Sequence, residues 1–122
     1  MALRGSYVQS IVDERLLEVA RLRSQLSKEL YGPYDFRQLQ SNLLHYVSSL
    51  KSLLLTLPRD MVGESYIQLY RRAGGLELLV VRATDVNQLL KYVDNADDIF
   101  METVNALYRL GVISEAARPP GG

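Results

Sequence analysis

The only histidine of the 122-residue chain, His45, is the first residue to consider for catalysis. As a general base it needs a nucleophile and an orienting acid nearby. Helical spacing brings Ser41, Ser48 and Ser49 within its reach, but no acidic residue lies at such a spacing. The nearest upstream arginine, Arg37, is eight positions away, whereas residues that share a helix face lie about three, four or seven positions apart. We therefore expect neither hydrolytic catalysis nor an Arg-to-His ribonuclease motif.

Four acidic residues lie close together near the C-terminal end, namely Asp94, Asp97, Asp98 and Glu102. Two i,i+4 pairs within this group would share one helix face, where carboxylates can hold a divalent cation. A simpler interpretation is a helix capped at Asn95 whose first turn carries acids that complement the helix dipole. The group could also receive a basic partner surface. Because the chain also lacks cysteine, we predict no metal site, no cofactor and no enzymatic activity.

Arg71 and Arg72 are the candidate binding residues. They follow two tyrosines and precede Gly74-Gly75, so they should lie at the C-terminal end of a short helix, where cations are favoured. Arginines beside tyrosines suit a nucleic-acid backbone and stacked bases. No acid near them in sequence obviously neutralises the pair. The sequence predicts a phosphate-binding set made of Arg71, Arg72, Lys51 and Arg59.

The overall charge is balanced, with 14 basic and 14 acidic residues, whereas a non-specific nucleic-acid binder usually carries a basic excess. The distribution is uneven: residues 1–59 hold eight basic and five acidic residues, and residues 84–122 hold three and six. Such a polar molecule could pack head to tail. The longest uncharged stretch, Gln38 to Leu50, is too short to cross a bilayer, and the N-terminus lacks the apolar core of a signal peptide. We expect a soluble, cytoplasmic protein.

Helices must position these residues, because apolar residues recur at steps of three and four along most of the chain. The first helix should span about residues 6–29 and end at Gly32-Pro33. The second should begin at a cap on Asp35, with Gln38 in capping-box position, and end before Pro58. Since the second helix has few charged residues after its cap, we expect it to be central.

The second half of the chain predicts two further helices and one ambiguous segment. A third helix should cover residues 60–73 and stop at Gly74-Gly75. Residues 76–83 could form a buried strand, but no second strand offers a partner, and helix is favoured. The last helix should begin near Asn95 and end at Gly111. The result is an all-α bundle of four to five helices, with one domain at residues 1–113 and a loose tail at 114–122.

Three stretches, taken in order, resemble the small helical subunit of type III CRISPR RNA-guided effector complexes. They are FRQLQSNLLHYVSSL (36–50), SYIQLYRRAGG (65–75) and IFMETVNALYRLGV (99–112). The resemblance covers about a third of the chain. It implies an architectural role, in which several copies stack and help to hold the target strand beside the guide, with Arg71 and Arg72 facing the backbone. The neutral charge of this chain departs from the basic surface that such subunits tend to show.

We therefore expect a non-catalytic architectural subunit that assembles with other protein subunits, including copies of itself, and that contacts RNA or single-stranded DNA. A self-assembling coat or scaffold protein is the alternative. A helical ribonuclease or nucleotidyltransferase toxin is disfavoured by the missing Arg-His pair.

Overall fold

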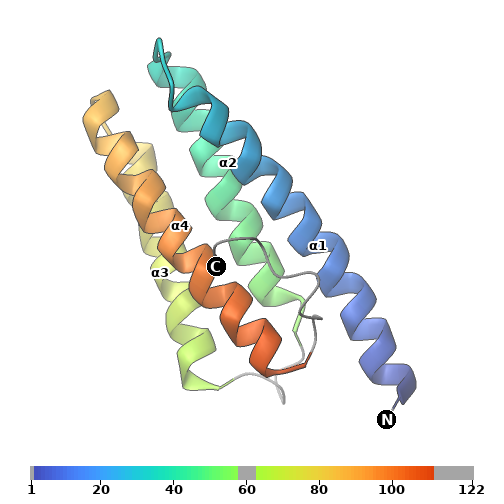
Figure 1. The fold of residues 1–122 in the computed structure, drawn as a ribbon. Helices are drawn as coiled ribbons and strands as arrows, with labels where there is room; N and C mark the ends of the chain where they lie inside the picture. Colours follow the sequence, from blue (N-terminus) through green and yellow to red (C-terminus); the bar gives the residue numbers. More distant parts are fainter. Residues whose placement is uncertain (1, 58–62, 112–122) are drawn as a thin grey trace.

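The computed structural model describes residues 2–57 and 63–111, which form four helices: α1 (Ala2–Glu29), α2 (Phe36–Leu55), α3 (Glu64–Arg82) and α4 (Val86–Arg109). The helices run alternately up and down in a bundle (Figure 1). The predicted all-α fold is confirmed. Several predicted features lie outside the described residues: Pro58, the start of the third helix at residue 60, and the tail at 114–122.

α2 is the central helix, as its sparse charges predicted. It packs against α1, α3 and α4, whereas α1 makes its main backbone contacts with α2 alone. The cap at Asp35 is also confirmed, because the Asp35 side chain accepts a hydrogen bond from the Gln38 N–H at 3.1 Å. The core runs along α2, whose buried side chains recur at steps of three and four and form one broad face: Leu39, Leu43, Tyr46, Val47, Leu50, Leu53 and Leu54.

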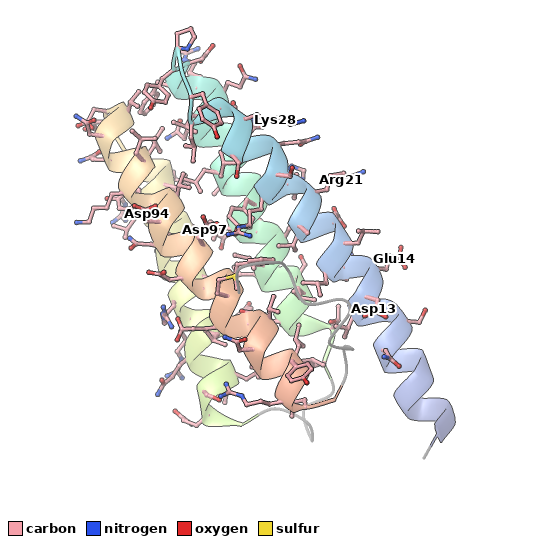
Figure 2. All side chains as sticks on the ribbon, viewed as in Figure 1. Asp13, Glu14, Arg21, Lys28, Asp94 and Asp97 are labelled. Carbon is pink, nitrogen blue, oxygen red and sulfur yellow. The ribbon has the colours of Figure 1, made fainter. Side chains whose placement is uncertain are left out.

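α1 lies along one side of α2 and is amphipathic. Its charged residues Asp13, Glu14, Arg21 and Lys28 project away from the bundle (Figure 2). The helix ends before Gly32, whose φ of 72° is favourable only for residues without a side chain. The residues that α1 buries are spaced at three, four and seven positions: Val12, Leu16, Val19 and Leu26.

The predicted break at Gly74-Gly75 is wrong, because α3 continues through both glycines to Arg82. A glycine weakens a helix interior by about 1 kcal/mol relative to alanine. Apolar residues on both sides of the glycines nevertheless share one buried stripe, and their burial outweighs this penalty. The ambiguous segment 76–83 is therefore helical through residue 82. The stripe consists of Tyr66, Leu69, Ala73, Leu76 and Val80.

The predicted start of the last helix at Asn95 is also wrong. α4 begins at Val86, where the Asp85 side chain accepts a hydrogen bond from the Gln88 N–H at 2.9 Å. The Gln88 side chain in turn accepts one from the Thr84 N–H at 2.7 Å. These two bonds satisfy backbone N–H groups at the helix start, which explains why the helix begins at Val86. The acidic residues 94–98 consequently lie in the middle of α4. The predicted end is confirmed, because Gly111 follows α4 with a φ of 75°.

The antiparallel arrangement determines where the basic first half and the acidic last part of the chain lie in the bundle. Because every helix spans the bundle, the basic first half and the acidic last helix lie side by side rather than at opposite ends (Figure 1). The charge difference therefore lies between helices of the bundle rather than between its two ends.

We expect Gly74→Ala and Gly75→Ala each to raise the free energy of unfolding by about 0.5–1 kcal/mol. Both glycines are helical, and a Cβ atom added at either meets nothing within 4 Å. Urea unfolding followed by circular dichroism at low protein concentration measures the change. Gly111→Ala is the matched control: its Cβ also meets nothing, but the positive φ should make it destabilising by about 1 kcal/mol. A loss of stability in both helical variants would contradict the prediction.

Candidate functional site

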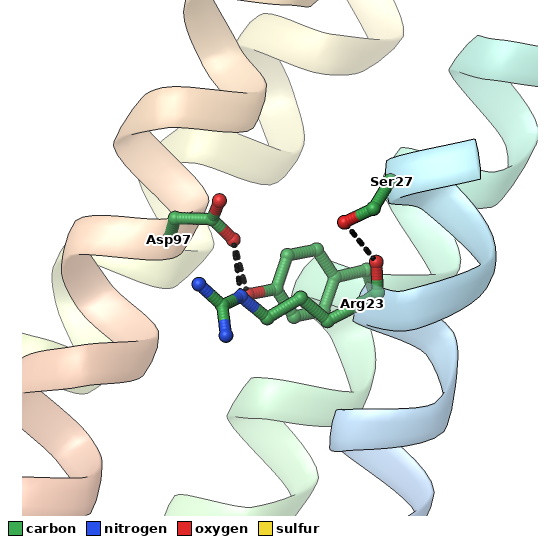
Figure 3. Close-up of polar contacts among 4 residues, drawn as sticks. Arg23, Ser27 and Asp97 are labelled. Carbon is green, nitrogen blue, oxygen red and sulfur yellow. Dashed lines mark hydrogen bonds and ion pairs between the residues drawn. The ribbon is translucent and has the colours of Figure 1, made fainter. Parts of the chain in front are cut away.

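The carboxylate of Asp97, in the middle of α4, is hydrogen-bonded to side chains of two other helices. Its Oδ1 accepts hydrogen bonds from Arg23 Nε of α1 at 3.1 Å and from the Tyr46 hydroxyl of α2 at 2.8 Å. Figure 3 shows the contact between Arg23 and Asp97. The Arg23 guanidinium also lies 5.0 Å from the centre of the Phe100 ring. One carboxylate thus connects three helices.

Tyr46 serves this cluster as a permanent hydrogen-bond donor. Burial, followed by the negative charge of Asp97 and the hydrogen bond to it, raises the pKa of Tyr46 far above its usual value, although Arg23 opposes the shift. The phenol therefore stays protonated near neutral pH, and its hydroxyl remains a hydrogen-bond donor to Asp97. The contacts of Arg23, Tyr46 and Asp97 are therefore those of a structural hydrogen-bond cluster rather than of an acid–base pair.

The predicted phosphate-binding residue Arg72 has an acidic partner in the structure. Its Nη1 lies 2.7 Å from Oε2 of Glu102 in α4, and both side chains are about half exposed. Glu102 is thirty positions from Arg72 along the chain, so the acids close to Arg72 in sequence gave no sign of this ion pair.

Lys51 is engaged on the other side of α3. Its Nζ lies 2.7 Å from Oε1 of Glu77 and 5.4 Å from the centre of the Tyr70 ring, and the Ser48 hydroxyl donates to Oε2 of Glu77. Partial burial works to raise the pKa of Glu77, but the hydrogen bonds from Lys51 and Ser48 and the charge of Lys51 outweigh it, so this pKa lies below its usual value. The hydrogen bond to Glu77 raises the pKa of Lys51.

The structure does not bring the four predicted cations together. Lys51 belongs to α2 and pairs with Glu77 on the α2 side of α3. Arg72 belongs to α3 itself and pairs with Glu102 on its α4 side. The two cations therefore lie on opposite flanks of α3. Arg59 lies outside the described residues. Arg71 alone points outward, with no ion pair in the described part of the chain. The four residues therefore do not form one clamp.

His45 lies in a polar depression between α1 and α2 with a volume of about 240 Å³, lined by Arg15, Glu18, Ser48, Ser49 and Ser52. Glu18 supplies the acid that the histidine's own helix lacks, but it lies 3.8 Å from Arg15. Ser48 donates to Glu77 instead. Within the described residues no hydrogen bond links His45 to a serine or to Glu18, so a base and a nucleophile are not aligned.

The acidic residues predicted to lie together, Asp94, Asp97, Asp98 and Glu102, do not all face the same side of α4. Asp97 faces the bundle interior, whereas Glu102 faces α3. Among residues 2–57 and 63–111, no three His, Asp or Glu side chains are placed to hold a metal ion.

The surface with the most unusual composition is the outward side of α3, opposite its buried stripe. We call it the α3 outer face and define it as Glu64, Ile67, Arg71, Gly74, Gly75, Leu78, Val81 and Arg82. Leu78 and Val81 are 57% and 58% exposed, and Ile67 is 43% exposed. Ile67, Leu78 and Val81 are eleven and three positions apart, spacings that place them on one helix face, so the sequence pattern alone indicates this face.

A groove of about 530 Å³ runs along one edge of this face, between α3 and α4. From α3 it is lined by Arg72, Gly75, Leu76 and Leu79, and from α4 by Asn95, Asp98 and Ile99; Arg72 is already paired with Glu102. The missing side chain of Gly75 leaves the groove open toward the α3 outer face. The two features together form one continuous surface.

Comparison with known proteins gives no relative: no family model, curated protein or solved structure matches the chain significantly. None of the described helices is both long and apolar enough to cross a membrane.

The two buried tyrosines form a matched pair for mutation. Tyr66 is 5% exposed, and its hydroxyl has no hydrogen-bond partner among the described residues, whereas the Tyr46 hydroxyl binds Asp97. We expect Tyr46→Phe to lower the free energy of unfolding by about 1–2 kcal/mol, because a bond to a charged acceptor is lost. Tyr66→Phe should leave it unchanged or raise it by up to about 1 kcal/mol, since a desolvated hydroxyl disappears. Urea unfolding of both variants checks the prediction, and equal losses would refute it.

The lowered pKa of Glu77 predicts a specific pH dependence. A depressed folded-state pKa contributes stability above the ordinary value near 4.5, and this contribution is lost as pH falls through the folded-state pKa. Glu77→Gln should therefore lower stability by about 1 kcal/mol at neutral pH, and the difference from wild type should shrink as the pH falls below the ordinary pKa of a glutamate. Urea unfolding between about pH 3 and pH 7 measures it. A difference that stays constant across this range would contradict the assignment.

Proposed function

We propose that this chain is a non-catalytic architectural subunit that joins a larger assembly through the α3 outer face. The observation that carries the proposal is the exposure of several apolar side chains beside two helical glycines on one helix side. Single exposed apolar residues are ordinary, but contiguous ones mark interaction surfaces. Glycines in a helix allow another backbone to approach closely, and no atom of the described residues, outside the adjoining part of the helix itself, lies within 4 Å of a Cβ added at either glycine.

Contact with RNA or single-stranded DNA remains a prediction that rests on Arg71 and on the resemblance to CRISPR effector small subunits. Arg72 and Lys51 would have to leave acidic partners to bind phosphate. A protein partner needs no such exchange, because the apolar residues of the α3 outer face are already exposed. The protein–protein part of the architectural role is therefore the better supported.

The test compares two exposed leucines. Leu78 lies on the α3 outer face, and Leu17 lies on the outward side of α1 with 72% exposure. We expect Leu78→Glu to release the chain from its assembly in native extracts, as measured by size-exclusion chromatography, because a charge would be buried at the interface. Leu17→Glu should leave the chain in the assembly. Circular dichroism should show both variants folded.

Incorporation of Leu78→Glu at the wild-type level would refute the proposed surface. If nuclease treatment instead releases the wild-type chain and Leu78→Glu has no effect, the nucleic-acid interpretation replaces it.

A further inference from the structure

The α3 outer face has a self-complementary order of residues about position 73. Glu64 and Arg82 each lie nine positions from this point, on opposite sides. Both side chains are exposed, and neither makes an ion pair within the described part of the chain. At a rise of 1.5 Å per residue they are each about 14 Å from the centre. If a second α3 is placed antiparallel across this point, the acid of each copy lies opposite the base of the other.

The inner positions follow this symmetry to within one residue. Ile67 lies six positions before the centre and Leu78 five positions after it, so apolar side chains meet in the antiparallel pair. Arg71 and Gly75 lie two positions before and after it. The long Arg71 side chain of one copy therefore lies over the glycine of the other, where no side chain obstructs it.

The groove beside α3 adds a polar partner for this arginine. Gly75 and Asp98 line the same groove, and Asp98 is exposed. An arginine that passes over Gly75 from a second copy enters the groove on the side where Asp98 lies. This contact would neutralise both charges, and twofold symmetry would form it twice.

We propose that the occupant of the α3 outer face is a second copy of this chain, paired through antiparallel α3 helices that cross near Ala73, Gly74 and Gly75. This inference rests on the proposed function, because it names the partner for the same surface. A twofold interface must be complementary to itself, and the order of charged, apolar and glycine positions meets this requirement. A single helix pair buries less than the roughly 1,600 Å² of a standard interface, so the dimer should be reversible.

The decisive experiment uses opposite charge reversals in the full-length chain. Glu64→Arg places like charges opposite each other twice in its own dimer, and Arg82→Glu does the same with acids. We expect each variant alone to dimerise about ten-fold more weakly than wild type in sedimentation velocity. An equimolar mixture of the two should recover wild-type affinity, because every arginine then meets a glutamate in the mixed dimer. Circular dichroism and urea unfolding verify that each variant is folded.

A steric variant tests the close approach independently. A Cβ atom added at Gly75 meets nothing within 4 Å and leucine favours helix, whereas in the antiparallel pair the side chain of Gly75→Leu would separate the two backbones. We expect it to weaken dimerisation at least ten-fold without a loss of monomer stability.

Three results would overturn the inference. A wild-type chain that stays monomeric at all concentrations excludes self-pairing, while the comparison of Leu78→Glu with Leu17→Glu still decides the proposed function separately. Single charge variants that dimerise as tightly as wild type would place the dimer interface elsewhere. A mixture that dimerises more tightly than wild type would show parallel rather than antiparallel pairing.

Discussion

The arrangement of the bundle depends on the carboxylate of Asp97. α1 has extensive backbone contact only with α2, so packing alone leaves its position relative to α4 weakly determined. Arg23 spans this distance, because it binds Asp97 through Nε and covers the Phe100 ring with its guanidinium. Tyr46 supplies the second bond to the same oxygen from the central helix. Apolar stripes tolerate sliding by a turn, whereas this shared acceptor fixes one register among the three helices.

The outward side of α3 differs from this three-helix contact, because its residues lower the stability of the helix. Two adjacent glycines in the helix interior weaken α3. The side chains of Ile67, Leu78 and Val81 on the same face remain about half exposed to solvent. Local rules are often broken where a protein binds something. The buried stripe of α3 is strong enough to hold the helix together across the glycines. The chain can therefore present a narrow, apolar surface without loss of its structure.

Most of the fold could be predicted from the sequence, and the errors have identifiable physical causes. The apolar spacing correctly predicted an all-α bundle, the central place of α2 and the ends at Gly32 and Gly111, but it divided the second half of the chain at the wrong residues. Gly74-Gly75 misled because local propensity was given more weight than a buried stripe that continues through it. The start of α4 was missed although Asp85 and Gln88 repeat the cap pattern that correctly located Asp35 and Gln38. The acids further along α4 seemed a better helix start because they suit the helix dipole.

The candidate site was harder to predict, since its decisive contacts join residues far apart along the chain. The sequence offered Lys51 and Arg72 as unpaired cations, but folding gives Glu77 to the first and Glu102 to the second. With Lys51 and Arg72 paired and the whole chain neutral, the predicted cations leave little positive charge for a phosphate backbone. Arg71 makes no ion pair within the described residues, and the α3 outer face around it consists mostly of apolar residues and glycines. A lone arginine in such surroundings is better suited to pairing with one acid of a protein partner, where complementary charges fix the register of two apolar surfaces.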